Sequence, residues 1–275
     1  MTTIVSIDTM PLYTHLHRIE KGLAALGVGP RDAIRPEQLF PLDQWHYRGT
    51  ESVRHAAEHL DLNAASTVLD IGSGVGGPAR FLAHTIGCHV TALELQPQLD
   101  EIATDLTRRC GLTDRVTHLC GDALDHPIAD LSFDAVVSWM VIHHILDRPR
   151  LCRRIAGALR PGGGCYIEDL YLRQSISGQD LSDVRDILFG KSMSPIDEFI
   201  NNLRDAGLAR VAAIDLTAEV TPFVVARLAS WQQDQTSHTR NYGEEAYAAL
   251  EHFFAVVARL FLDGKIGCVR LTATT

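Results

Sequence analysis

The sequence lacks several features that would each point to a particular class of protein. No stretch approaches the ~18 consecutive apolar residues of a membrane span, and the first residues, MTTIVSIDTM, have no basic segment followed by a long apolar one. No run of Lys or Arg is long enough to follow a phosphate backbone, and the formal net charge is -9. We therefore expect a cytoplasmic protein with no membrane span, no nucleic-acid partner and a small-molecule ligand.

Cysteine is scarce, and its spacing argues against a metal or a disulfide framework. The 6 cysteines form no CxxC pair and mostly lie within apolar runs, as reduced thiols in a protein core do. The histidines show no metal-ligand spacing either, so we expect no bound metal. A chain of 275 residues with 46% hydrophobic composition is long enough to bury one sizeable core.

The stretch VLDIGSGVGGPARFLA, residues 68–83, organises the rest of the chain. Its apolar start predicts the end of a buried strand, and its glycines predict a tight turn before a helix whose free N–H groups can bind a ligand. Gly72, Gly74 and Gly77 also fit a loose dinucleotide pattern, GxGxxG. Asp70, however, stands where that pattern usually has an apolar residue, and it favours a cationic or amino-bearing ligand.

Two further carboxylates follow the next two predicted strands. Glu94 ends CHVTALE, where a carboxylate can accept hydrogen bonds from both hydroxyls of a ribose. Asp122 follows the apolar positions Val116 and Leu119 at the expected end of a third strand, where it could bind an exocyclic amine. These positions predict a nucleoside site without specifying the nucleoside.

Five features in this order resemble those of the class I S-adenosyl-L-methionine-dependent methyltransferases. They are VLDIGSGVGG, the strand-end Glu94, GDAL at 121–124, SFDAVVSWMVIHHILD at 132–147 and LRPGGGCYIED at 159–169. The resemblance covers about residues 66–169, and it implies S-adenosyl-L-methionine as the cofactor.

The resemblance also implies a role for each matching residue. For the methionine end of the cofactor it assigns Asp70, Gly72, Ser73, Gly74 and Gly76. For the adenosine end it assigns Glu94 and Gln98 to the ribose, Leu95 to the face of the adenine, and Asp122 and Ala123 to its edge. Trp139, within the fourth feature, is a further candidate for the cofactor site.

The segment DQWHYRG, residues 43–49, resembles the lid that closes over the sulfonium in small-molecule methyltransferases, including those that act on glycine betaine precursors. This resemblance adds Gln44 and Tyr47 to the cofactor site, and an aromatic face attracts a cation. The alternative is that Trp45 and Tyr47 only fill a hydrophobic joint.

Strand and helix patterns alternate from residue 66 onward. Strands are expected at 66–71, 88–94, 115–119, 132–138, 164–169, 211–217 and 265–274, and helices near 76–86, 97–110 and 148–158. This alternation predicts an α/β fold with a Rossmann-like, doubly wound, mostly parallel seven-stranded sheet. Ligands then bind at the carboxyl ends of its strands.

We expect an N-terminal helical lid segment at 1–60 and a methyltransferase domain at 61–275. Apolar residues at helical spacing predict one amphipathic helix at 11–27. Insertions at 171–192 and 218–263 are expected to join the N-terminal segment in an α-helical cap over the strand ends. The alternative for one of these helices is a contact in a homodimer.

Two histidines and two carboxylates follow the fourth and fifth predicted strands. Neighbouring parallel strands bring their ends together, so His143, His144, Glu168 and Asp169 are expected beside the transferred methyl group. A resemblance to bacterial sugar O-methyltransferases of natural-product pathways assigns the base to His144, oriented by Asp169, with His143 as the other candidate. The alternative is that one histidine caps the next helix or bonds buried backbone.

The expected activity is methyl transfer to an oxygen or nitrogen of a small natural product or metabolite. Two alternatives remain open: C-methylation of an isoprenoid or lipid-like acceptor with Glu168 as base, and binding of S-adenosylmethionine without turnover. A nicotinamide dehydrogenase is disfavoured by Asp70 and by the GDAL and RPGG motifs. Arg227, after the sixth strand, either pairs with an anionic acceptor group or lies on a helix surface.

Overall fold

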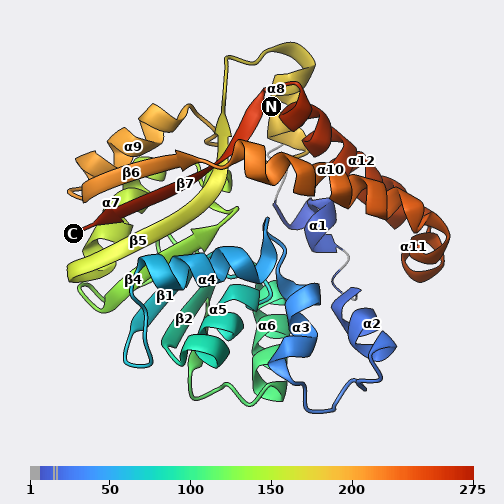
Figure 1. Ribbon diagram of the computed structural model, residues 1–275, viewed down its shortest axis with the longest axis horizontal. Coiled ribbons are helices and arrows are strands. Elements are labelled where there is room, and N and C mark those ends of the chain that lie inside the picture. Colours follow the sequence, from blue (N-terminus) through green and yellow to red (C-terminus); the bar gives the residue numbers. More distant parts are fainter. Residues whose placement is uncertain (1–6, 15, 17) are drawn as a thin grey trace.

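One seven-stranded sheet forms the centre of the molecule, with helices on both faces (Figure 1). The computed structural model describes residues 7–14, 16 and 18–275. Strands β1 to β7 are Thr67–Ile71, His89–Glu94, Val116–Cys120, Phe133–Trp139, Leu159–Leu172, Ala209–Asp215 and Ile266–Thr274. Their order is β3-β2-β1-β4-β5-β7-β6. β7 is antiparallel to β5 and β6 and the other neighbours are parallel, so the predicted fold is confirmed.

The central strands are apolar along most of their length because helices cover both faces of the sheet. On β1, Val68 packs in the same cluster as residues of α4 (Gly49–His59) and α5 (Gly77–Phe81). Its neighbour Leu69 points the other way and packs with residues of α7 (Arg148–Ala158) and α9 (Ile196–Asp205). Alternation along the strand therefore attaches one helical layer to each face.

The turn after β1 requires glycine at its first position. Gly72 has a φ of +72°, in the left-handed region, and a Cβ there would overlap the Val141 side chain. The backbone of the turn therefore lies directly against the segment that follows β4. α5 begins after this turn, and α6 (Pro97–Arg109) follows β2.

The helices between β6 and β7 form an arm at the right of Figure 1. They are α10 (Thr217–Gln233), α11 (Gln235–Tyr242) and α12 (Glu244–Leu262). α12 buries a stripe that includes Leu250, Phe254, Val257 and Phe261. No helix in the part of the chain that the structure describes is long and apolar enough to cross a membrane.

The N-terminal segment contains short helices and not the single helix expected at 11–27. α1 (Pro11–Thr14) ends before α2 (Arg18–Ala25) begins, and His15 and His17 lie outside the described residues. α1 packs against α12, whereas Ile19 and Leu23 of α2 belong to a cluster with residues of α3 (Pro36–Asp43) and α6. Because the two halves pack on different partners, one straight helix cannot satisfy both.

The remaining short elements are η1 (Ile7–Thr9), η2 (Leu82–Ile86), η3 (Ile142–His144) and α8 (Gly178–Asp186). β5 begins at Leu159, earlier than the expected 164, because Leu159 already pairs with Phe133 of β4.

Candidate functional site

Two adjoining cavities lie at the carboxyl ends of β1, β2 and β4. We call them the Asp70 cavity and the Glu94 cavity, each after a residue that lines it. With the part open to solvent included, their volumes are about 860 and 680 Å³. The residues that line both are Tyr13, Gly72, Gly74, Val141 and His144. A ligand in one cavity can therefore extend past the glycine turn into the other.

The Glu94 cavity holds most of the residues expected at the adenosine end. Its lining includes Glu94, Leu95, Asp122 and Ala123. Glu94 accepts hydrogen bonds from the backbone N–H of Gly74 (2.8 Å) and of Gln96 (2.9 Å), which fix its carboxylate beside the glycine turn. Burial raises the pKa of Glu94.

Gln98, expected to contact the ribose, is not among the residues that line this cavity. α6 begins at Pro97, and Gln98 is exposed on its first turn. Gln96, the residue before the helix, lines the cavity instead.

The Asp70 cavity begins at the end of β1. Asp70 is 1% exposed, and its Oδ2 has no hydrogen-bond partner among the residues that the structure describes; the same holds for Ser73 Oγ. Burial, with the charge of Glu94 as a smaller cause, raises the pKa of Asp70 to about 8. An unpartnered buried carboxylate is costly, and a ligand with a positive charge or N–H donors would offset that cost.

The glycine turn lines this cavity only in part. Gly72, Ser73 and Gly74 line it. Gly76, also expected at the cofactor, does not line it. It is the N-terminal cap of α5 with a φ of +79°, and the Arg80 guanidinium lies against it from behind.

The N-terminal segment closes one side of the Asp70 cavity. Trp45, His46 and Tyr47 line it, and Tyr47 also packs edge-on against Phe223 and Phe261, with ring centres 5.9 and 6.0 Å away. Tyr47 therefore both lines the cavity and fills a hydrophobic joint.

Gln44, expected to contact the cofactor, does not line either cavity. Its amide Nε2 donates to Asp43 Oδ1 at 2.9 Å, and its Oε1 lies 3.0 Å from the ring of His46. These contacts hold the side chain behind the segment. Burial lowers the pKa of His46 to about 4, so this ring is neutral.

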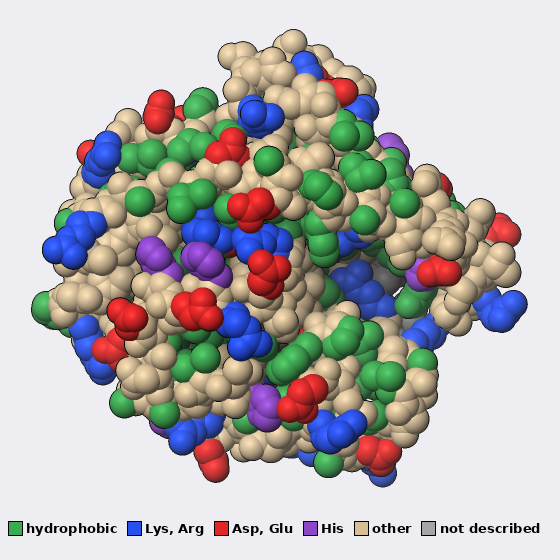
Figure 2. Space-filling view, viewed as in Figure 1, with side chains coloured by type: hydrophobic (Ala, Val, Ile, Leu, Met, Phe, Trp, Pro, Cys, Tyr) green, Lys and Arg blue, Asp and Glu red, His purple; other side chains and the backbone are tan. Residues whose placement is uncertain are grey.

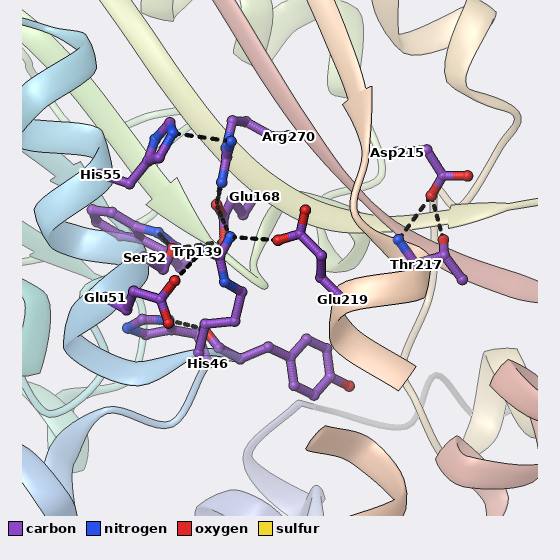
Figure 3. Close-up of polar contacts among 12 residues, drawn as sticks. His46, Glu51, Ser52, His55, Trp139, Glu168, Asp215, Thr217, Glu219 and Arg270 are labelled. Atoms are coloured by element: carbon purple, nitrogen blue, oxygen red, sulfur yellow. Dashed lines mark hydrogen bonds and ion pairs between the residues drawn. The ribbon is translucent and has the colours of Figure 1, made fainter. Parts of the chain in front are cut away.

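Glu168 lies behind Trp139 and does not line the cavity, which corrects its expected place beside the methyl group (Figure 3). Trp139, which does line it, donates its indole N–H to Ser52 Oγ at 2.8 Å, and Ser52 donates to Glu168 at 2.6 Å. Glu168 also pairs with Arg270 at 3.1 Å and accepts from the Tyr166 hydroxyl at 2.5 Å. Successive residues of β5 point to opposite faces, which sends Glu168 away from the side of Asp169.

Arg48 ties the N-terminal segment to α10 and to the sheet. Its guanidinium lies 2.6 Å from Glu51, 3.3 Å from Glu219 of α10 and 4.0 Å from Glu168. At the start of α10, Asp215 accepts the backbone N–H of Thr217 at 2.9 Å (Figure 3). The wall formed by Trp45, His46 and Tyr47 is thereby fixed to the arm.

Asp169 orients His143 and not His144, which corrects the expected pairing. Asp169 Oδ1 lies 2.5 Å from His143 Nδ1, and Oδ2 accepts the backbone N–H of His143 at 2.9 Å. The Leu170 N–H donates to the same carboxylate at 2.6 Å. His143 lines the Asp70 cavity, and its Nε2 has no hydrogen-bond partner within the described ranges. Asp169 itself is fully buried behind the ring.

His144 has a different environment from its neighbour. It donates Nδ1–H to the Phe189 carbonyl at 3.0 Å and lines both cavities. Burial, helped by the neighbouring His143, lowers its pKa well below the usual range, so the ring is neutral.

Several lining residues carried no usable signal in the sequence. Tyr13 and Asp43 belong to short helices of the N-terminal segment, and Leu170, Phe253 and Val257 look like ordinary core positions. They reach the cavity through tertiary packing of α1, α3, β5 and α12.

Comparison with known proteins identifies the family. A family model for a methyltransferase domain matches residues 69–167. The methyltransferase GfsG of Streptomyces halstedii is 33% identical over 190 residues, which cover 68% of this chain and 67% of that protein. The chain belongs to the class I S-adenosylmethionine-dependent methyltransferases. S-adenosylmethionine is therefore its cofactor.

Two further similarities agree with this assignment. The 27-O-demethylrifamycin SV methyltransferase of Amycolatopsis mediterranei (strain S699) is 34% identical to this methyltransferase over 166 residues, 59% of this chain and 61% of that protein. The solved structure of phosphoethanolamine N-methyltransferase 2 of Haemonchus contortus with S-adenosyl-L-methionine has the same fold, with a TM-score of 0.79 and 20% identity. That match covers 99% of this chain and 60% of the other. This chain thus spans less than two thirds of these two proteins.

Proposed function

We propose that this methyltransferase methylates a hydroxyl oxygen of a small molecule, with His143 as the general base and Asp169 as the residue that orients it. The observation that carries the proposal is the His143–Asp169 pair, 2.5 Å apart, with His143 Nε2 free in the cavity that Asp70 and the glycine turn also line. A positioned base matters for a hydroxyl, which must lose its proton, and not for a neutral amine.

The two cavities together would hold the cofactor. The unpartnered Asp70 carboxylate and Ser73 hydroxyl suit the polar methionine end, and Glu94 suits the ribose. Leu95 and the pair Asp122 and Ala123 would enclose the adenine. When bound, S-adenosylmethionine supplies a methyl group already activated on a positively charged sulfur.

The chain itself then has to align the acceptor, accept its proton and exclude water. His143 Nε2 would accept the hydroxyl proton, while Nδ1–H stays bonded to Asp169 and the carboxylate stabilises the positive charge that forms on the ring. The aromatic faces of Tyr47 and Trp139, which line the cavity, favour a cation beside them.

The other candidate reactions have less support. C-methylation would need Glu168 as its base, but Glu168 is bonded to Ser52, Tyr166 and Arg270 behind Trp139 and does not face the cavity. Transfer to a neutral amine is compatible with the cavity, but it needs no base and so does not account for the oriented His143.

The proposal is tested with methyl-labelled S-adenosylmethionine and a panel of phenols, sugars and amines. We expect turnover with hydroxyl acceptors and a loss of about 10²- to 10⁴-fold in kcat for His143→Gln, with the Kd of S-adenosylhomocysteine within about twofold. Asp169→Asn should also lower kcat. His144→Ala is the matched control at the neighbouring residue. Because His144 lines both cavities, this substitution should raise the Kd of S-adenosylhomocysteine by a larger factor than it lowers kcat.

Two results would contradict the proposal. Binding of S-adenosylhomocysteine without turnover of any acceptor would make the chain a silent binder. Turnover of amines alone, with kcat unchanged in His143→Gln, would show that no base takes part.

A further inference from the structure

Two arginines beside the Asp70 cavity have no carboxylate partner in the part of the chain that is described. Arg227, which lines the cavity, donates to the backbone carbonyl of His46 at 3.3 Å. Arg18 has a buried Nε and a buried Nη2 without hydrogen-bond partners. The fully buried Arg80, by contrast, pairs with Asp43 at 2.9 Å.

Each guanidinium group lies on the ring of an aromatic residue that lines the cavity, Trp45 for Arg18 and Tyr47 for Arg227. The Arg18 Cζ is 3.9 Å from the ring centre of Trp45. The Arg227 Cζ is 5.6 Å from that of Tyr47 and 4.6 Å from that of Phe223. Burial and then the charge of Arg227 lower the pKa of Arg18 to about 10, so the two positive charges act on one another.

This arrangement is unfavourable unless an anion joins it. Stacking on a ring compensates only part of the desolvation of a guanidinium, and two like charges repel. Figure 2 shows a hollow between the arm and the lower part of the molecule, with Lys and Arg side chains on its floor. An anion from solvent can therefore reach this side of the molecule.

We propose that the acceptor carries an anionic oxygen group, a carboxylate or a phosphate, and that Arg18 and Arg227 bind it. The planar fork of a guanidinium matches the paired oxygens of either group. This inference rests on the proposed function, because it names the class of acceptor.

Binding of the anion is measured on the full chain saturated with S-adenosylhomocysteine. Thermal unfolding is followed with sodium benzoate, with inorganic phosphate, and with sodium chloride at equal ionic strength. The variants are Arg18→Gln and Arg227→Gln, and the matched control is Arg108→Gln, an exposed α6 arginine paired with Asp105. We expect benzoate or phosphate to raise the Tm of the wild type and of the control by about 2 °C or more. The Tm of Arg18→Gln and of Arg227→Gln should not change on addition of either anion.

A second measurement uses acceptors in matched pairs, such as 4-hydroxybenzoate and its methyl ester, and 4-hydroxyphenyl phosphate. The anionic member should have a KM lower by about tenfold or more in the wild type, and Arg227→Gln should remove this difference. Comparison of the carboxylate acceptor with the phosphate acceptor distinguishes the two kinds of anion.

The inference is overturned if the anions stabilise all four proteins equally or none of them. It is also overturned if Arg227→Gln weakens S-adenosylhomocysteine about tenfold while the anion effects persist, because the arginines would then bind the carboxylate of the cofactor. Anion-dependent stabilisation without any turnover would instead contradict the proposed function, so the two failures are distinguishable.

Discussion

Asp70 and Glu94 lie at the carboxyl ends of neighbouring strands of the sheet, and the charge of Glu94 adds to burial in raising the pKa of Asp70 to about 8. Between its unfolded value of 3.8 and about 8, the carboxyl therefore binds more protons in the folded chain than in the unfolded one.

This difference predicts how stability depends on pH in the ligand-free protein. Because the folded state holds the extra proton, the contribution of Asp70 is complete below pH 4 and is lost as pH rises through 8. The slope approaches about -1.4 kcal/mol per pH unit within that window. Urea unfolding at several pH values should show this slope in the wild type and a flatter one in Asp70→Asn. Equal slopes in the two proteins would disprove the assignment.

The glycine turn offers a comparison between two glycines with the same backbone requirement. Gly72 and Gly74 both have positive φ, but an added Cβ overlaps Val141 only at Gly72. Gly74→Ala should cost about 1–2 kcal/mol in the free energy of unfolding, from backbone strain alone. Gly72→Ala should cost clearly more and should weaken S-adenosylhomocysteine measurably by calorimetry. Similar losses in both variants would show that the contact with Val141 relaxes without cost.

Removal of Glu168 should destabilise the fold because it leaves Arg270 buried without its partner. Both side chains are nearly inaccessible, so Glu168→Ala should lower the free energy of unfolding by about 3–5 kcal/mol in urea. Asp186→Ala, which breaks an exposed pair with Arg185, is the control and should change it by less than about 0.5 kcal/mol.

The same position also tests whether Glu168 takes part in the reaction. Glu168→Gln keeps the shape and should retain methyl transfer in the folded protein. A loss of about 100-fold in kcat at unchanged stability would make Glu168 the base after all.

The features predicted correctly are those that local sequence patterns determine. The apolar run ending at Asp70, the glycines after it and the strand ending at Glu94 follow short-range rules of strand period and turn chemistry. Because parallel strands end at one edge of the sheet, these rules also place both carboxylates near one another.

The features predicted wrongly depend on a few backbone angles or on distant contacts. Which histidine meets Asp169 depends on Met140, whose φ of +58° turns the chain into η3 and presents His143 to the carboxylate. Which glutamine lines the Glu94 cavity depends on where α6 begins, and the helix start at Pro97 places Gln96 there and not Gln98. No periodicity in the sequence carries such information.

The arm has a further consequence for how such a protein can change. It leaves the sheet after β6 and returns at the adjacent β7, so its two ends are anchored on neighbouring strands. A different helical insert between the same two anchors would leave the turn at Gly72 and the carboxylate of Glu94 untouched. Acceptor preference could thus diverge by exchange of one contiguous stretch of chain, while the machinery for the methyl donor is inherited intact.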